Sequence, residues 1–200
     1  SIVMVGSEAV PYAKTGGLGD VLGALPRALG RLGHRVTVVL PRYRGIAAGE
    51  RLTSASIPMG GRLVTAVYYV ERAHEFVEMV LVDCPEFFDR DGLYTVEGVD
   101  YPDNPARFGF LARASLEFLA LGNEPTSVLH AHDWQAGLLP VYLRRLYQHH
   151  ARLDAVPVGF TIHNLAYQGL ADAGWLPGLD LGPDVFVPGA LESLEYFGQI

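Results

Sequence analysis

Residues 2–41 read IVMVGSEAVPYAKTGGLGDVLGALPRALGRLGHRVTVVLP, and this stretch decides the fold class. Ile2 to Val5 is a short apolar run rich in β-branched residues, which is typical of a parallel strand covered on both faces. Apolar residues then recur at helical spacing from Val21 to Leu32, and the pattern stops at Gly33. Arg35 to Leu40 is a second β-branched run. The stretch therefore predicts a βαβ unit and the beginning of a parallel sheet.

The rest of the chain predicts further elements of the same α/β class. One local conflict lies at Pro26, because proline inside a helix removes a donor and clashes with the preceding turn, at about 3 kcal/mol. We expect a kink or a restart there. The other predicted elements are a hairpin from Arg62–Val70 and Glu75–Val82 added to the sheet, a helix around Phe108–Leu119 with Asp103 as a possible cap and Gly122 as its stop, a short strand at Val128–Leu129, a helix from Trp134 to Tyr147 interrupted near Pro140, and a strand from Val156 to Ile162.

Composition excludes several classes of protein. The chain has 200 residues, 50% of them hydrophobic and 18% charged, which fits one packed domain or at most two small ones and not a disordered chain. A net charge of −7 without a basic stripe argues against nucleic acid as a partner. No apolar run approaches the roughly 20 residues that span a bilayer, so we expect no membrane association and a cytoplasmic location. The single cysteine, Cys84, is expected to be a buried small hydrophobe.

The two ends of the sequence indicate a piece of a longer protein. The first residue is not Met, and the last residues, LEYFGQI, read as the middle of an element without a polar tail. We therefore expect residues 1–200 to be an incomplete domain.

Polar motifs follow three of the predicted parallel strands: SEAVPYAKTGGLGD after Val5, HAHDW after Leu129 and HNLAYQG after Ile162. In open α/β sheets, ligands bind in the crevice outside the carboxyl ends of the strands. Loops are polar in any protein, so one such motif alone would mean little. Three of them together predict a single ligand site at this edge.

The first motif indicates an anion site. Gly16, Gly17 and Gly19 uncover backbone N–H groups where the helix begins, at the positive end of its dipole. The motif is neither the GxGxxG of dinucleotide enzymes nor a P-loop. The 15 basic residues are 14 Arg and one Lys, Lys14, whose compact ammonium fits beside a phosphate or a sugar hydroxyl; chance placement is the alternative. Asp20 either joins the site or only favours the helix dipole.

The second and third motifs favour neutral hydroxyls as ligands. His130 and His132 share one face of a strand, but no third ligand follows at the spacing of a closed metal site, so we expect no metal. Asp133 is a candidate acceptor for sugar hydroxyls, whereas Trp134 is expected to pack in the core. The third motif supplies His163, Asn164 and Tyr167, with a structural His163 as the alternative; Tyr94 and Tyr101 either stack on sugars or pin their loop.

The order and spacing of KTGGLGD, HAHDWQAGLLP and FTIHNLAYQG closely resemble bacterial glycogen synthases and plant starch synthases, and the resemblance runs along essentially the whole chain. It implies the GT-B glycosyltransferase architecture, in which two Rossmann-like domains close over a nucleotide sugar. Residues 1–200 are then most of the N-terminal domain, a three-layer Rossmann-like domain with a mainly parallel sheet, and the C-terminal nucleotide-binding domain lies outside the chain.

The resemblance also implies an activity. Members of this family transfer glucose from ADP-glucose to the non-reducing end of an α-1,4-glucan in glycogen biosynthesis, with retention of the α configuration and without a metal or another cofactor. The expected catalytic residues are Lys14, Asp133 and His163. The expected substrate-binding residues are Lys14 near the diphosphate and donor glucose, the amides of Gly16 and Gly17, Asp20, Tyr94 along the acceptor path, and Asp133, His163 and Asn164 at the donor glucose and acceptor.

Two alternatives stay open. The protein is either a related glycosyltransferase that uses UDP-glucose, or a catalytically silent homologue that binds glucan or regulates. The family's phosphate-binding Arg and Lys and its essential Glu belong to the C-terminal domain, so this chain alone is expected to be inactive. Gln135 stands where some members have His, which we do not interpret as a loss of function.

Overall fold

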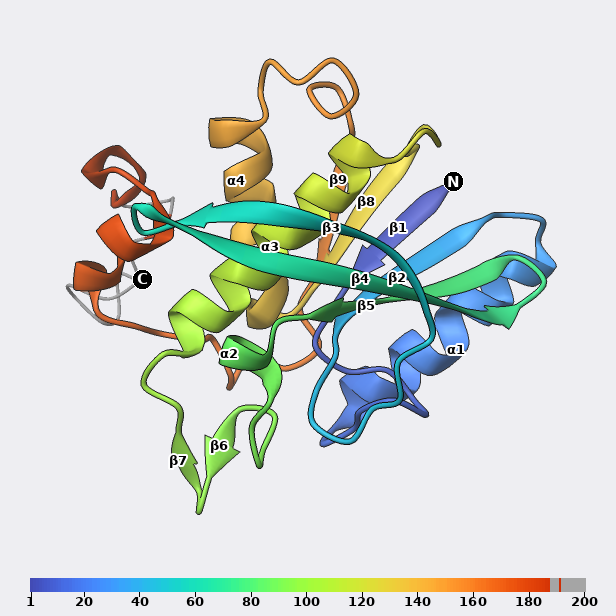
Figure 1. Ribbon diagram of the computed structural model, residues 1–200, viewed down its shortest axis with the longest axis horizontal. Coiled ribbons are helices and arrows are strands. Elements are labelled where there is room, and N and C mark those ends of the chain that lie inside the picture. The colour runs from blue at the N-terminus through green and yellow to red at the C-terminus, as the bar shows by residue number, and fades with distance from the viewer. Residues whose placement is uncertain (188–190, 192–200) are drawn as a thin grey trace.

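The computed structural model describes residues 1–187 and 191. Its centre is a seven-stranded sheet with the strand order β3-β4-β5-β2-β1-β8-β9 (Figure 1). The strands of this sheet are β1 (Ile2–Val5), β2 (Val36–Pro41), β3 (Glu50–Met59), β4 (Arg62–His74), β5 (Val77–Asp83), β8 (Val128–His132) and β9 (Val158–Thr161), and a separate small hairpin consists of β6 (Thr95–Val96) and β7 (Val99–Asp100). The α-helices are α1 (Gly17–Arg31), α2 (Pro85–Phe88), α3 (Asn104–Leu121) and α4 (Leu138–Leu146), with short 3₁₀ turns η1 (Trp134–Ala136), η2 (Ala173–Trp175), η3 (Pro177–Leu179) and η4 (Pro183–Val185).

The sheet is mainly parallel, as predicted. Strands β5, β2, β1, β8 and β9 run in the same direction, and Val5 at the end of β1 pairs with Val39 on one side and Ala131 on the other. The antiparallel pairings of this sheet are β3 with β4 and β4 with β5, so β4 runs against the other strands. The predicted α/β class with an antiparallel addition is therefore confirmed.

Helices cover the two faces of the sheet, which gives three layers (Figure 1). Alternate residues of β1 point to opposite faces, so Met4 packs with Leu22 of α1 in one core cluster. Val3 and Val5 belong to the other cluster, with Leu111 of α3. Each fully buried side chain of this size contributes about 1.5–3 kcal/mol relative to exposure, so burial on both faces holds the central strands in place.

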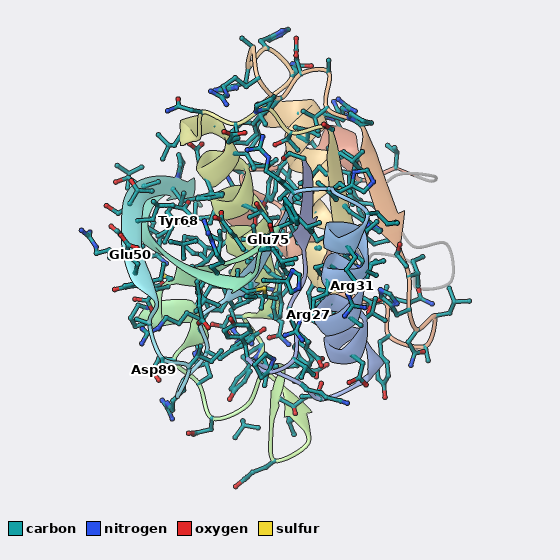
Figure 2. The ribbon with its side chains drawn as sticks, turned by 90° about the vertical axis from the view of Figure 1, so that its right-hand side faces the viewer. Arg27, Arg31, Glu50, Tyr68, Glu75 and Asp89 are labelled. Atoms are coloured by element: carbon teal, nitrogen blue, oxygen red, sulfur yellow. The ribbon has the colours of Figure 1, made fainter. Side chains whose placement is uncertain are left out.

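The antiparallel part of the sheet is larger than the sequence predicted. The predicted hairpin is the β4–β5 pair, but β5 also joins the parallel core, and β3 was missed. The turn between β3 and β4 is Gly60–Gly61, with φ of 57° and 79°, the left-handed backbone that a two-residue hairpin requires. The hairpin lies over α3, where the Tyr68 hydroxyl donates to the Ala114 carbonyl at 2.8 Å (Figure 2).

The structure departs in part from the two expectations about proline. Helix α1 continues through the buried Pro26 without a restart, and a kink there stays a prediction. The outer face of the same helix carries the exposed Arg27 and Arg31 (Figure 2). The interruption expected at Pro140 falls instead at Gly137, between η1 and α4. Pro140 lies in the first turn of α4, where a backbone N–H has no intrahelical partner.

The remaining local expectations are partly confirmed. Gly122 ends α3, and Cys84 is buried, with burial raising the pKa of its thiol to about 11. Asp103 occupies the N-cap position of α3, but its carboxylate accepts a hydrogen bond from Arg90 at 2.7 Å and does not cap the helix. Across the described part of the chain, every helix is too short or too polar to cross a bilayer.

Candidate functional site

The three polar motifs lie at one edge of the sheet, as the strand order predicts. Strands β1, β8 and β9 are parallel neighbours, so the segments that follow them leave from the same edge. The backbone N–H of His163 donates to Asp133 Oδ1 at 2.7 Å, which joins the third motif to the second. A Cβ built on Gly6 would lie 3.7 Å from the His132 Cβ, so the first motif borders the second.

Glu8 organises the first motif, and the sequence reasoning gave it no role. Its side chain is only 3% exposed. One carboxylate oxygen, Oε2, accepts the backbone N–H groups of Thr15 at 2.6 Å and Gly16 at 3.0 Å. The other, Oε1, accepts the hydroxyls of Thr15 and Tyr94, each at 2.7 Å. The signal that could have found it is an acidic residue three positions after a buried strand, followed by the apolar Ala9-Val10-Pro11.

These hydrogen bonds keep Glu8 ionised. Burial alone would raise the pKa of its carboxyl, but the hydrogen bonds from Thr15, Tyr94 and Gly16 outweigh burial and hold the pKa below its ordinary value. Burial raises the pKa of the Tyr94 hydroxyl, which stays protonated and lies 2.6 Å from Ser7 Oγ as well. The protein therefore carries a fixed negative charge beneath the glycine-rich loop.

Tyr94 is enclosed by neighbouring side chains. Its ring lies 5.8 Å from the Phe108 ring and 5.9 Å from the Trp134 ring, centroid to centroid. Its hydroxyl is turned toward Glu8. The reading in which this loop tyrosine pins its loop to the core is thus supported by the geometry, and a contact of Tyr94 with an acceptor stays a prediction.

The start of α1 is open to solvent. Gly16 is the N-cap residue and no side chain caps the helix. The Gly16 amide is engaged by Glu8, whereas the amides of Gly17, Leu18 and Gly19 have no acceptor within the helix because they lie in its first turn. A Cβ built on Gly16 or Gly17 would meet no atom of the described residues within 4 Å. The roles of Gly16 and Gly17 toward a ligand stay predictions.

Lys14 lies beside this open helix end and pairs with Asp20. Its Nζ is 2.6 Å and 2.7 Å from the two carboxylate oxygens, and the side chains are 49% and 62% exposed. Exposed pairs of this kind contribute about 0–1 kcal/mol, so another anion can take the place of Asp20 at small cost. Gly19 gives the lysine its path, since a Cβ there would lie 3.1 Å from the Lys14 Cβ and Cγ.

Three histidine rings lie in a row at the ends of β8 and β9. The rings of His130 and His132 are 4.0 Å apart and those of His132 and His163 are 5.3 Å apart, which confirms that the first two share a face. His132 Nδ1 is 3.0 Å from His163 Nε2, and His130 Nε2 is 2.7 Å from Thr161 Oγ1. Burial, then His130, then His163 lower the pKa of His132 to about 3, so its ring is neutral.

The geometry of this row of histidines does not form a metal site within the described residues. Within the described residues, no group of three or more His, Cys, Asp or Glu side chains is placed to hold a metal ion. The row is instead tied together by hydrogen bonds between rings and to a hydroxyl. The expected absence of a metal stays a prediction.

Asp133 positions the segment that follows β9. Its backbone φ of 58° turns the chain at the end of β8, and its Oδ1 accepts the His163 N–H at 2.7 Å. Asn164 Oδ1 accepts the Ala166 N–H at 2.9 Å, which closes a local turn. A contact of these side chains with a sugar stays a prediction.

Trp134 packs beneath the third motif. It lies against the larger core cluster, which confirms the expected core packing. Gly169 has a φ of 66°, and a Cβ there would lie 2.4 Å from Trp134 Cε3, so only glycine fits over the indole. Residues 162–169 are otherwise exposed.

A hollow of about 160 Å³ lies behind the first motif, where Tyr12 lines it together with Pro26 of α1 and Glu71 of β4. The edge that bears the three motifs is an open surface in the described part of the chain, since Lys14 to Gly17 and residues 162–169 are exposed. A ligand at this edge would lie against an open surface of this chain, with one of its sides facing solvent.

The fold and this edge define the N-terminal type of domain of a GT-B glycosyltransferase. A family described as starch synthase catalytic domain matches residues 1–200, and the chain belongs to that family. The catalytic domain of Starch Synthase IV from Arabidopsis thaliana, solved with ADP and acarbose bound, superposes with a TM-score of 0.89 at 29% sequence identity, over 100% of this chain and 41% of that one.

Curated relatives agree with this assignment. Glycogen synthase 2 of Geobacter metallireducens is 40% identical over 204 residues, covering 100% of this chain and 41% of the relative. The glycogen synthase of Anaeromyxobacter dehalogenans is 43% identical over 211 residues, covering 100% of this chain and 41% of the relative. The chain thus spans about two fifths of the length of the proteins that it matches, 41% in both cases.

Proposed function

We propose that the full-length protein containing this chain is a glycogen (starch) synthase, which transfers glucose from ADP-glucose to the non-reducing end of an α-1,4-glucan with retention of configuration. Its relatives are called glycogen synthases, and the similar plant starch synthase was solved with ADP and acarbose. ADP-glucose and the glucan are the proposed substrates. The cytoplasmic location stays a proposal alongside them.

The observation that carries this proposal is the open start of α1. Neither steric crowding by the described residues nor a left-handed backbone explains glycine at positions 16 and 17. Close approach of a ligand to the backbone does explain it. With Lys14 beside it, the helix end offers a fixed ammonium and amides at the positive end of a dipole, which is an environment for a diphosphate.

The proposed chemistry follows from these charges. Departure of ADP places negative charge on the leaving diphosphate, and Lys14 with the start of α1 stabilises that charge without reorganising. This arrangement needs no metal. Asp133, His163 and Asn164 lie at the neighbouring strand ends, where they would bind the donor glucose and the acceptor. Retention is proposed to proceed by same-face substitution, with the His163 backbone carbonyl nearby.

The deciding experiment is transfer of labelled glucose to glycogen by the full-length protein, with ADP-glucose and UDP-glucose in separate and competing assays. We expect transfer from ADP-glucose, and none from residues 1–200 alone. Preference for UDP-glucose would move the protein to a related glycosyltransferase. Glycogen binding without transfer from either donor would identify a silent glucan-binding homologue.

A variant of the full-length protein tests the carrying observation. Gly17→Ala adds a methyl group that meets no described atom, so folding should be unchanged or slightly stabilised, because alanine is the better helix former by about 1 kcal/mol. The KM for ADP-glucose should rise about tenfold or more through steric conflict with the phosphates. Ala28→Ser, on the exposed side of the same helix, is the matched control. An unchanged KM in Gly17→Ala would remove this helix end from the site.

A further inference from the structure

We propose that Glu8 is a positioning residue, whose buried carboxylate holds the glycine-rich loop from Lys14 to Gly17 in the shape that meets the donor diphosphate, with Tyr94 as its partner. The inference rests on the proposed transfer from ADP-glucose. It assigns a role to a side chain that lies under the site and does not face it.

The hydrogen bonds to Glu8 saturate its carboxylate. An ionised carboxylate has about four acceptor positions, and the two amides and two hydroxyls from Thr15, Gly16 and Tyr94 supply four donors. A side chain so engaged and only 3% exposed has no capacity left for a ligand. Its influence on chemistry must therefore pass through the loop that it holds.

The direction of these hydrogen bonds sets which groups of the loop face outward. The amides of Thr15 and Gly16 point inward to Glu8, while the residues on either side, Lys14 and Gly17, are exposed. Glu8 also acts as the glutamate of a capping box does, because it accepts the N–H of the N-cap residue Gly16, which has no side chain of its own. Without Glu8, the inward amides of Thr15 and Gly16 would lose their acceptor.

We call the four hydrogen bonds to the Glu8 carboxylate the Glu8 clamp. Tyr94 connects this clamp to helix α3. The Asn104 side-chain amide donates to the Tyr94 carbonyl at 3.0 Å, and Arg107 donates to Asn104 Oδ1 at 2.6 Å. Arg107 is fully buried and also donates to the Phe87 carbonyl at 2.7 Å. Hydrogen bonds thus connect the start of α3 to Tyr94 and Tyr94 to Glu8. The same carboxylate accepts the backbone N–H groups of Thr15 and Gly16 in the loop.

The test compares variants of the full-length protein. Glu8→Ala should lower kcat/KM for ADP-glucose at least tenfold, and Glu8→Gln should recover most of that loss. Glutamine keeps one oxygen for the two amides, and its NH₂ can donate to the hydroxyls of Thr15 and Tyr94, which accept as well as donate. Glu117→Ala is the matched control, because Glu117 accepts a tyrosine hydroxyl, that of Tyr147 at 2.5 Å, toward the other end of α3.

A merely structural role makes different predictions. Glu8→Ala should lose more thermal stability than Glu117→Ala, because Glu8 accepts four hydrogen bonds and Glu117 accepts one from Tyr147. In the proposed role, only Glu8→Ala loses kcat/KM and speeds hydrogen exchange at the Thr15 and Gly16 amides. Equal losses of kcat/KM in both variants, or unchanged kcat/KM in Glu8→Ala, would overturn it. If the wild type transfers no glucose at all, the proposed function fails by itself, and Glu8 is judged by amide exchange and by ADP affinity in the same variants.

A double-mutant cycle tests the partnership with Tyr94. If Tyr94 acts by holding Glu8, Tyr94→Phe should lower kcat/KM several-fold in the wild type and have little further effect in Glu8→Ala. Losses that multiply would show that the two side chains act separately, and would contradict the pairing.

Discussion

The loop after β1 and the loop after β9 meet at the same edge but are held in contrasting ways. The first is fixed by one buried carboxylate with four hydrogen bonds. The second is held at His163 by Asp133 and rests on Trp134, while Leu165 and Tyr167 are 75% and 69% exposed. Few buried contacts mean low local stability. The loop of the proposed anion site is therefore held firmly, and it adjoins a more exposed segment with fewer buried contacts.

The largest expected effect comes from removing the cation of the proposed anion site. In the full-length protein, Lys14→Gln should lower kcat for glucosyl transfer about 10²-fold or more, by analogy with loss of a preorganised electrostatic donor. Steady-state kinetics with labelled ADP-glucose measure this directly. Because the Lys14–Asp20 pair is exposed, thermal stability should barely change.

Asp20→Asn is the companion to that variant. It frees the ammonium without removing it, so the loss of turnover should be much smaller than in Lys14→Gln. Near-normal turnover in Lys14→Gln would instead take the lysine out of the proposed chemistry and leave the anion site to the helix end alone.

The second loop is expected to respond somewhat less, by about ten- to a hundredfold in turnover. Asp133→Asn keeps an oxygen for the His163 N–H and nearly the same side-chain shape at this strained backbone position, with φ 58° and ψ −180°, so circular dichroism should show an intact fold. His163→Ala should lower transfer in the same range. A lost fold in either variant favours a structural role, and normal transfer by Asp133→Asn would reduce Asp133 to an anchor of the loop.

The smallest expected effect concerns the dependence of stability on pH. His132, beside the second loop, should lose its contribution at a higher pH than Glu8, beneath the first. The pKa of His132 is about 3 in the folded protein and near 6.5 when unfolded, so its contribution to stability is complete above about pH 6.5. As the pH falls from there toward 3, the unfolded chain binds the extra proton, and stability drops by up to about 1.4 kcal/mol per pH unit. Glu8, with a pKa below its ordinary value of 4.5, loses its contribution only at lower pH.

Denaturation of the full-length protein between pH 7 and 5 measures this difference. His132→Leu should flatten the dependence of stability on pH in that range, and hydrogen exchange on acidification should rise near His163 before it rises at Thr15. A slope equal to that of the wild type would show that His132 does not carry the depressed pKa.

The parallel core was predictable because its strands are continuous apolar runs and α1 has a helical period. Strand β3 was missed because half of ERLTSASIPM is polar and most of it is exposed at the sheet edge, although Gly60–Gly61 marks its turn. The effect of proline was overestimated at both positions. Helix α1 continues through Pro26, and Pro140 lies in the first turn of α4, where no intrahelical hydrogen bond is lost.

The sequence predicted where on the sheet the candidate site lies, but not the side-chain contacts within it. Strand order alone brings the three motifs to one edge. The clamp at Glu8 was not predictable, because one of its partners, Tyr94, is 86 residues away and its other donors include backbone amides that look alike in any sequence. The same holds for Gly169, whose glycine is explained only by the indole beneath it.

The Lys14–Asp20 ion pair has a consequence for discrimination among anions. Before a ligand arrives, the ammonium is already neutralised by the first-turn carboxylate. Because the pair is exposed, displacing that carboxylate costs an incoming anion only about 0–1 kcal/mol, and an ion that merely replaces it gains equally little. In the proposed function, a diphosphate ester gains more than a weakly charged ion, because its charge faces the ammonium and the helix end at once.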